Sequence, residues 1–356
     1  DGSGSNHDMS GVADGTIIVT ATVSGTTSSN FFVTQDITKP TMTITSGTVV
    51  SGATTNTAAI AFTFTSSETT TNLVVGDITA NGCSLSSFSG SGAVYTATCT
   101  ATSDGAKSVL MNAGTFTDSV TNPNTASNTY SWTADVTVPT LSSVTLNSNN
   151  ANNDLSIDGN TITLAFTSSE TIGTPTCAIK FNGADATNAE TITNPGAGNN
   201  WLCTVVTHDS DADGVVAFTI GFSDSAGNAG VAVTSTTDSS AVTHDDTVPT
   251  LTTVVESVNG AGNGNNGDIV TLTITPSEAI QQPVCTFQSG DANMANSPSY
   301  GTGSGNVRTC SIIVADGDTN GAVTFSIAFD DTAGNAGVAV TAASSGAVTI
   351  DNTHPT

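Results

Sequence analysis

The chain has 356 residues, which is enough for two to four domains of ordinary size. Only 4 Lys and Arg stand against 30 Asp and Glu, so the formal net charge is −26. Such a surface repels nucleic acid and anionic lipid, which are bound through Lys and Arg, and it attracts divalent cations. No apolar run approaches the roughly 18 residues that a membrane-spanning helix requires.

The first part of the chain differs from the rest. Residues 1–38 contain two strand-like runs, ADGTIIVTATVSG and NFFVTQD, which match only the last two strands of the longer repeats that follow. We therefore expect a partial domain here. Either the sequence is a segment of a longer array, or a neighbouring molecule completes the partial domain by donating strands to its open edge.

Four related linkers recur about every 100 residues, a period that fits a full domain repeated in series. They read DITKPT, DVTVPT, DDTVPT and DNTHPT. Each proline fixes its own φ and favours an extended residue before it, so the linkers are predicted to be short and stiff. The sequence thus predicts complete domains at 39–138, 139–248 and 249–356.

Between the linkers, apolar residues alternate with polar ones at the period of a β-strand. Examples are IAFTFT at 60–65, TITLAFT at 161–167 and IVTLTIT at 269–275. These runs are rich in Thr, Val, Ile and Phe, and clusters of Gly, Asn, Asp and Pro separate them. About seven strands fit each domain, which is the number and spacing of a small antiparallel sandwich.

Six cysteines fall as one pair in each complete domain, and none has the C-x-x-C spacing of a zinc site. One disulfide per domain is the expected arrangement, and it indicates an oxidising, extracytoplasmic compartment. The alternative is six buried free thiols. The predicted pairs are Cys83–Cys99, Cys177–Cys203 and Cys285–Cys310.

One phrase is written twice, as FSDSAGNAGVAVT at 222–234 and FDDTAGNAGVAVT at 329–341. Together with the linkers, a TSSE motif and a DG turn, it gives an order of motifs that resembles the bacterial immunoglobulin-like repeats of large surface adhesins, fibres and surface-layer proteins. The resemblance covers 41–356. It implies an all-β chain of tandem immunoglobulin-like antiparallel β-sandwiches arranged as a rod, with an extracellular structural or adhesive role. In the second domain AGN is replaced by VTN, which puts the role of that loop in doubt.

In such a sandwich the incoming linker meets the loops after the second and sixth strands at one end. Carboxylates from the linker, the TSSE motif and the D-x-AGN loop are therefore expected to meet, and oxygen-rich clusters suit Ca²⁺. The predicted calcium ligands are Asp135, Glu170, Asp224 and Asn228 in the third domain, and Asp245, Asp246, Glu278, Asp331 and Asn335 in the fourth; the second-domain equivalents are Asp36, Glu68, Asp118 and Asn122. The alternative is that each Asp caps a turn, with Gly227 and Gly334 at positive φ.

A second acidic stretch lies at the opposite end of the third and fourth domains. Its spacing resembles the first half of an EF-hand loop, but the Glu at position twelve is missing and strands flank it. It is either a weaker calcium site or a plain hairpin turn. The candidate ligands are Asp209, Asp211, Asp213, Asp316, Asp318 and Asn320.

We expect no enzyme activity, because no histidine pairs with a repeated nucleophile and the Gly-rich stretches lack the Lys of a phosphate-binding loop. The expected function is a structural segment of an extracellular microbial surface fibre or adhesin shaft. One alternative is a self-assembling subunit of a filament or surface layer, joined through the partial domain by strand complementation. Another is a glycan-binding adhesive module. Expected partners are neighbouring immunoglobulin-like domains and, for an adhesive module, cell-surface glycans or other cells.

Overall fold

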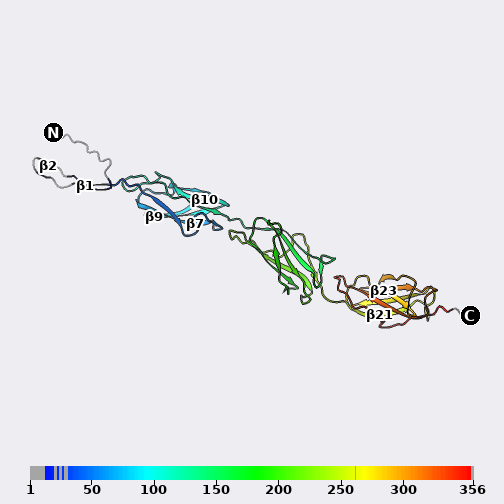
Figure 1. Ribbon diagram of the computed structural model, residues 1–356. Helices are drawn as coiled ribbons and strands as arrows, with labels where there is room; N and C mark the ends of the chain where they lie inside the picture. Colours follow the sequence, from blue (N-terminus) through cyan, green and yellow to red (C-terminus); the bar gives the residue numbers. More distant parts are fainter. Residues whose placement is uncertain (1–12, 20–21, 24–25, 28–30, 261, 354–356) are drawn as a thin grey trace. The chain divides into compact units, whose positions relative to one another are not determined.

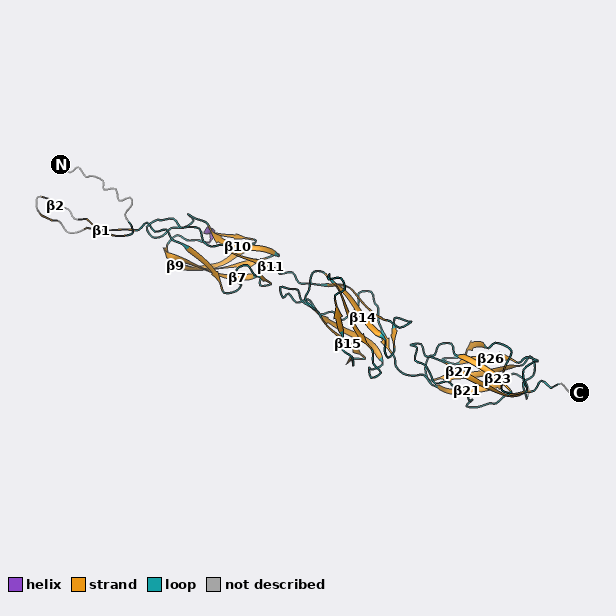
Figure 2. Cartoon of the chain, viewed as in Figure 1, coloured by secondary structure: helices purple, strands orange, loops and turns teal. Residues whose placement is uncertain are grey.

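The computed structural model describes residues 13–353 apart from 20–21, 24–25, 28–30 and 261 (Figure 1). The chain forms two compact units, one made of Asp1–Pro139 with Ser223–Gly230 and the other of Thr140–Phe222 with Val231–Thr356. Nearly all regular structure in the described residues is β-strand, as Figure 2 shows. Three separate hydrophobic cores lie within the predicted domains 39–138, 139–248 and 249–356. Residues 1–12 and 354–356 of the predicted end domains lie outside the described residues.

The first unit begins with a hairpin in which β1 (Gly15–Val19) pairs antiparallel with β4 (Phe31–Gln35). Gly15 lies opposite Gln35, just as Gly105 lies opposite Ala134 in the next domain. The hairpin therefore has the register of a domain's last strand pair, as the sequence match predicts. Two short strands, β2 (Thr22–Val23) and β3 (Thr26–Thr27), pair with each other between them.

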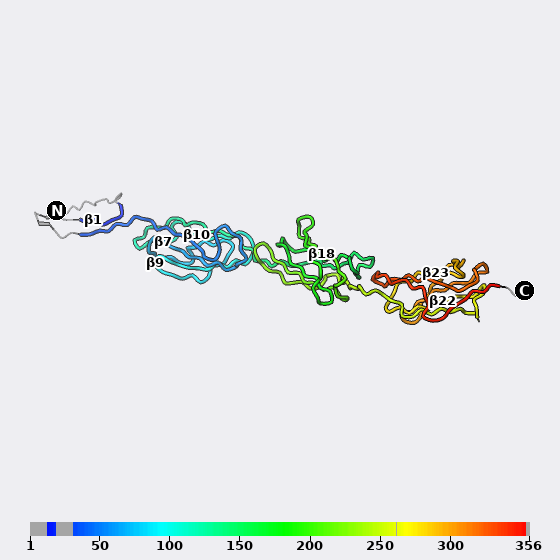
Figure 3. The backbone as a smooth tube through the Cα atoms, turned by 60° about the horizontal axis from the view of Figure 1, so that its bottom comes forward, coloured from blue at the N-terminus to red at the C-terminus, as the bar shows by residue number. Residues whose placement is uncertain are grey.

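The second domain is a sandwich of two sheets, with strand orders β6-β11-β10-β8 and β5-β7-β9. In the backbone tube of Figure 3, β7, β9 and β10 lie together in this domain. Apolar residues on alternate positions face inward, so that Phe62 packs edge-on against Tyr130 with ring centroids 5.3 Å apart. The elements are β5 (Met42–Ser46), β6 (Thr54–Thr55), β7 (Ala59–Thr70), the helical turn η1 (Val75–Asp77), β8 (Ile78–Asn81), β9 (Cys83–Ala101), β10 (Gly105–Met111) and β11 (Tyr130–Ala134).

The third domain pairs a sheet of order β12-β14-β18-β17 with one of order β13-β20-β19-β15-β16. It has nine strands rather than about seven, because two- and three-residue segments add to the sheet edges. Its inward positions carry a core that includes Phe166, Phe181 and Trp201. The strands are β12 (Leu141–Ser148), β13 (Leu155–Ser156), β14 (Thr161–Ser168), β15 (Thr176–Phe181), β16 (Ala184–Asp185), β17 (Thr191–Thr193), β18 (Asn200–Val206), β19 (Gly214–Gly221) and β20 (Thr243–His244).

The fourth domain repeats this plan, with sheets of order β21-β22-β26-β25 and β24-β23-β27-β28. Pairing within these sheets is antiparallel throughout. The strands are β21 (Leu251–Val258), β22 (Ile269–Pro276), β23 (Val284–Ser289), β24 (Ala292–Asn293), β25 (Ser299–Thr302), β26 (Arg308–Ile313), β27 (Gly321–Ala328) and β28 (Thr349–Ile350).

Each complete domain contains the disulfide predicted for it, namely Cys83–Cys99, Cys177–Cys203 and Cys285–Cys310. In the third domain the bond joins β15 of one sheet to β18 of the other, and in the fourth it joins β23 to β26. In these two domains the disulfide therefore connects the two layers of the sandwich, whereas Cys83 and Cys99 both lie in β9. No described residue belongs to a helix long and apolar enough to cross a membrane.

Candidate functional site

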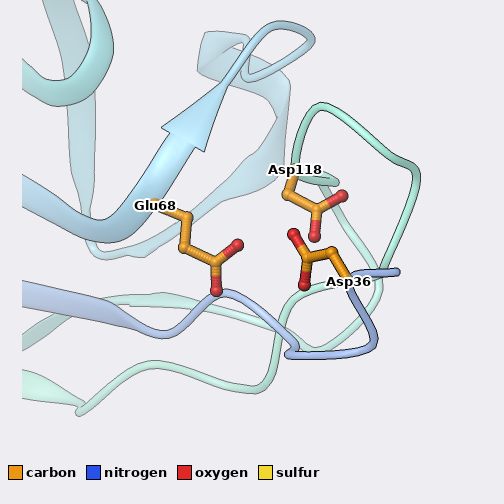
Figure 4. A group of neighbouring side chains, drawn as sticks. All are labelled: Asp36, Glu68 and Asp118. Carbon is orange, nitrogen blue, oxygen red and sulfur yellow. The ribbon is translucent and has the colours of Figure 1, made fainter. Parts of the chain in front are cut away.

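Three carboxylates meet where the first linker enters the second domain, as Figure 4 shows. Asp36 comes from the linker, Glu68 from β7, and Asp118 from the loop that follows β10. One oxygen of each lies within 4.8 Å of the others. Burial raises the pKa of Glu68, and repulsion by Asp36 and Asp118 raises it further. The cluster thus concentrates negative charge that nothing within it neutralises.

The same arrangement occurs in the fourth domain. Asp245, Glu278 and Asp331 each offer an oxygen within 4.8 Å of the others, and Asp331 is fully buried. Burial raises the pKa of Glu278, as does repulsion by Asp245 and Asp331. Burial also raises the pKa of Asp245. The prediction that these three elements converge at one end of the sandwich is therefore met in both domains.

The third-domain residues of the predicted site are divided between the two compact units. Asp135, Asp224 and Asn228 belong to the first unit, and Glu170 belongs to the second. Within the first unit the Asn228 amide nitrogen lies 2.9 Å from the Asp135 carbonyl oxygen and 3.4 Å from its carboxylate. Burial raises the pKa of Asp135, and the nearby Asp224 carboxylate raises it further.

The loop Asp of each cluster also caps its own turn. Asp331 Oδ1 accepts the backbone N–H groups of Gly334 at 2.6 Å and Asn335 at 2.9 Å, while Oδ2 accepts the Asn335 amide at 2.8 Å. Gly334 has a φ of 105°, which the turn requires and which only glycine adopts readily. The two alternatives predicted from the sequence, a calcium ligand and a turn cap, therefore involve the same side chain. Asp331 caps its turn and still lies within reach of the other two carboxylates.

The VTN variant of this loop in the second domain keeps the bonds between the Asp and the Asn, and its further backbone donor is Val120. Asp118 accepts the backbone N–H of Asn122 at 2.9 Å and its side-chain amide at 2.8 Å. Burial alone would raise the pKa of Asp118, but hydrogen bonds from Asn122 and Val120 outweigh it and leave that pKa below its usual value. The change from AGN to VTN thus leaves the bonds between the Asp and the Asn in place.

The amide nitrogens of the loop asparagines hold the linker, while metal binding through their amide oxygens stays a prediction. In each copy the amide nitrogen donates to the carbonyl oxygen of the linker Asp as well as to the loop Asp. The pairs to the linker are Asn122 to Asp36 at 3.0 Å, Asn228 to Asp135 at 2.9 Å, and Asn335 to Asp245 at 2.6 Å.

The next peptide N–H of the same linker is held by the preceding domain. The carboxylate of Asp104, in the DG turn before β10, accepts the backbone N–H of Val136 at 2.6 Å and the hydroxyl of Thr137. The peptide group between Asp135 and Val136 is thus bound on its oxygen by Asn228 and on its nitrogen by Asp104. We call this two-sided arrangement the linker clamp.

The linker clamp recurs at the other two junctions between described segments. Asp14 accepts the N–H of Ile37 at 2.6 Å, and Asp213 accepts that of Asp246 at 2.7 Å. At the last linker Asn320 accepts the N–H of Asn352 at 2.7 Å. Sequence reasoning missed this arrangement, although the repeated pairing of a DG or NG turn with a D-x-T linker was the signal.

The second acidic stretch does not gather its carboxylates. Asp211 binds the backbone N–H groups of Thr187 and His208, and Asp318 binds those of Ala295 and Ala315, all at 2.8–2.9 Å. Asp213 belongs to the linker clamp. Among the described residues, no group of three clustered acidic ligands includes Asp209, Asp211, Asp213, Asp316 or Asp318. Calcium binding there stays a prediction, and the contacts correspond to the alternative of a hairpin turn.

Asp246 also departs from its predicted place. Its carboxylate accepts the N–H of Asp158 and lies 3.0 Å from His244 Nε2, outside the cluster of Asp245. His244 Nδ1 lies 3.1 Å from the Ser156 hydroxyl. The order Ser–His–Asp resembles a hydrolase relay, but Ser156 and His244 are fully buried, so a substrate cannot reach that hydroxyl.

Residues 36–136 match the model of a family described as the bacterial Ig-like domain. The second domain matches the bacterial Ig-like family. The match begins at the linker Asp36 and ends just after Asp135, so it spans one whole repeat from linker to linker. The resemblance inferred from the sequence is thereby confirmed for this domain. No curated protein matches the chain.

Several solved structures resemble the chain at low identity. The match to an I-band fragment of titin covers 90% of this chain and 100% of the titin fragment, with 9% identity and a TM-score of 0.41. The match to a tetra-tandem repeat from the extending region of a large adhesion protein covers 97% of this chain and 84% of that structure, with 19% identity and a TM-score of 0.34. At this level of likeness neither structure bears on function.

Proposed function

We propose that the chain is a non-enzymatic structural segment of an extracellular microbial surface fibre or adhesin shaft. The observation that carries this proposal is the linker clamp. A flexible tether between independent domains needs no contacts to its backbone, whereas here successive linkers have the same peptide group bound from both sides. Hydrogen bonds on both sides of each linker peptide resist bending, which suits a spacer that sets reach.

The disulfides support an extracytoplasmic location. In each complete domain the two cysteines form one disulfide, and no described cysteine is free. Such bonds persist in oxidising compartments and are rare where thiols are kept reduced. Bacterial Ig-like sequence in the second domain fits the same setting.

Antibody labelling of intact source cells, followed by electron microscopy of the detached material, tests the proposal. We expect label on unpermeabilised cells and thin beaded fibres. Label that appears only after permeabilisation would contradict it.

A filament subunit is the second candidate, because the β1–β4 hairpin exposes apolar side chains. Phe31 is 68% exposed, Phe32 62% and Ile18 57%. Ile18 and Phe32 are direct cross-strand neighbours, whereas the matching pair in the second domain is Ser108 and Ser131. Strand addition from another molecule would cover this surface. Long polymers of the purified chain, lost on Phe32→Ser, would favour this candidate over the shaft.

We further propose that Ca²⁺ binds the carboxylate clusters of Asp36, Glu68 and Asp118 and of Asp245, Glu278 and Asp331. Hard cations take oxygen ligands of this kind, and an ion would offset the repulsion that raises the pKa of both Glu residues. At a free Ca²⁺ concentration of one hundred times Kd, each site would add about 2.7 kcal/mol to the free energy of unfolding. Calorimetry of the full chain with Ca²⁺ and with chelator measures this, and identical melting curves would refute it.

Glu68→Gln should change the melting temperature in opposite directions without and with Ca²⁺. Because the folded-state pKa of Glu68 is raised, its ionisation costs stability as pH rises through that pKa, and below about pH 4 the cost disappears. Without Ca²⁺ we therefore expect Glu68→Gln to raise the melting temperature at pH 7 by a few degrees and to leave it unchanged at pH 3. With Ca²⁺ the variant should melt below the wild type. A variant that melts identically in both conditions would argue against the site.

A further inference from the structure

The fourth domain contains a small cavity of about 150 Å³ at the edge of its β21-β22-β26-β25 sheet. The segment before β23 forms one side of it, and the edge strand β25 and β26 form the other. Its lining includes Ile280, Gln282, Pro283, Tyr300, Thr302 and Arg308. The volume is below the ~300 Å³ at which pockets for drug-sized ligands begin, so the cavity suits a single small ring.

The residues around this cavity share one face of the sheet. Thr302 lies directly opposite Arg308, and Tyr300 lies directly opposite Cys310. Directly opposed residues of an antiparallel pair point to the same side, and Cys310 is buried in the core. Tyr300 and Arg308 therefore stand on the inner face, and at the sheet edge Tyr300 remains 40% exposed.

The third domain has a tryptophan where the fourth has this arginine. Trp201 precedes Cys203 by two residues, as Arg308 precedes Cys310, and both strands pair in the same way with the second long strand of their domain. Trp201 is buried and belongs to the hydrophobic core. In the fourth domain the charged Arg308 stands in place of that apolar tryptophan, and it lines the cavity.

Arg308 is the only arginine of a chain whose net charge is −26. It makes no ion pair with any described residue. Its guanidinium donates to the carbonyl oxygens of Ile280 at 3.1 Å, Asn306 at 3.3 Å and Val307 at 3.4 Å. Since an arginine carries five N–H donors, two are left for a ligand. These carbonyl bonds hold the guanidinium at the cavity.

We propose that this cavity binds the carboxylate of a sugar acid, such as a terminal hexuronate, through Arg308. A guanidinium pairs with a carboxylate by two parallel hydrogen bonds, which gives both strength and orientation. The ring of Tyr300 offers an apolar face for the sugar, and the Gln282 amide and Thr302 hydroxyl offer partners for its hydroxyl groups. This binding role is independent of the proposed structural one.

The same features disfavour an acidic peptide as the ligand. A peptide would extend beyond a cavity of this size, and a chain with a net charge of −26 repels additional carboxylates. A terminal sugar acid brings one carboxylate, which meets the one guanidinium, and its remaining groups are uncharged. The charge balance thus favours a single sugar acid at a chain end over a polyanion.

The test is a titration of the full chain with methyl β-glucuronide and, separately, with methyl β-glucoside, which carries a hydroxymethyl group in place of the carboxylate. Saturation-transfer NMR gives the affinities. We expect millimolar binding of the glucuronide, at least about 10-fold weaker binding of the glucoside, and a similar loss for Arg308→Gln. Lys180→Gln removes one positive charge elsewhere in the chain and should change nothing.

Three outcomes would overturn the proposal: equal binding of the two glycosides, undiminished binding by Arg308→Gln, or binding of an acidic tetrapeptide in place of the glucuronide. Calorimetry establishes that each variant is folded. If Arg308→Gln destabilises the domain, Arg308→Trp fills the cavity as the third domain does, and Tyr300→Ser alters an exposed residue. Both should weaken binding of the glucuronide, and retained binding in either would contradict the assignment.

Discussion

Replacing both cysteines of one disulfide should lower the free energy of unfolding of that domain by about 3 kcal/mol. In the fourth domain the bond Cys285–Cys310 spans a sequence separation of 25 residues, and in the third Cys177–Cys203 spans 26. A cross-link over such a loop restricts the unfolded chain, and it also joins the two sheets in the folded state. For a domain of about 100 residues this corresponds to a fall in melting temperature of roughly 12–24 °C.

The double variant Cys285→Ala/Cys310→Ala measures the effect in the full chain by calorimetry. Because the three cores are separate, only the transition of the fourth domain should move, and the corresponding third-domain variant should move only its own. The unaltered domains serve as internal controls in the same scan. A shift of less than about 3 °C would show that the bond contributes little beyond what the core already provides.

Much of the fold could be predicted because its determinants are local and repeated. Alternation in IAFTFT at 60–65 places Phe62 and Phe64 inward, and both are fully buried. The spacing of the cysteines assigned one pair to each domain, and the three bonds follow it. Short edge strands such as β16 and β17 were not predicted, since two or three residues leave no measurable periodicity and depend on what the neighbouring strand offers.

The candidate site was only partly predictable. Strand order alone brought Asp245, Glu278 and Asp331 to one end, because topology decides which loops meet. Asp246, one residue further along, was also expected there, but it turns away to His244. Alternation along an extended linker sends adjacent side chains to opposite sides, so Asp246 lies on the side of His244, two residues before it. Its long-range partner, the N–H of Asp158, depends on the folded domain.

The linker clamp and the cavity were not predictable for a related reason. Asp104 looks like an ordinary turn residue until its carboxylate is found on the backbone N–H of Val136, far along the chain. Likewise, the sequence shows Arg308 only as an isolated cation in a strand. Its equivalence to the third-domain Trp201 becomes clear only when the two strands are aligned through their pairing partners.

Asp331→Ala should destabilise the fourth domain by about 3 kcal/mol or more. Asp331 is fully buried and accepts the N–H groups of Gly334 and Asn335 as well as the Asn335 amide. Alanine removes three hydrogen bonds to a charged acceptor, and such bonds contribute about 1.5–3 kcal/mol each. It also frees Asn335, which holds the linker carbonyl of Asp245.

The matched control is Asp330→Ala, which removes the same charge from the adjacent, exposed residue. Calorimetry without Ca²⁺ should show a fall of at least about 12 °C for Asp331→Ala and almost none for the control. Asp331→Asn retains one side-chain oxygen for the two backbone donors, so it should lie between them. If Asp331→Ala and its control melted together without Ca²⁺ and separated only with it, the carboxylate would serve the cation alone and the turn would not need its cap.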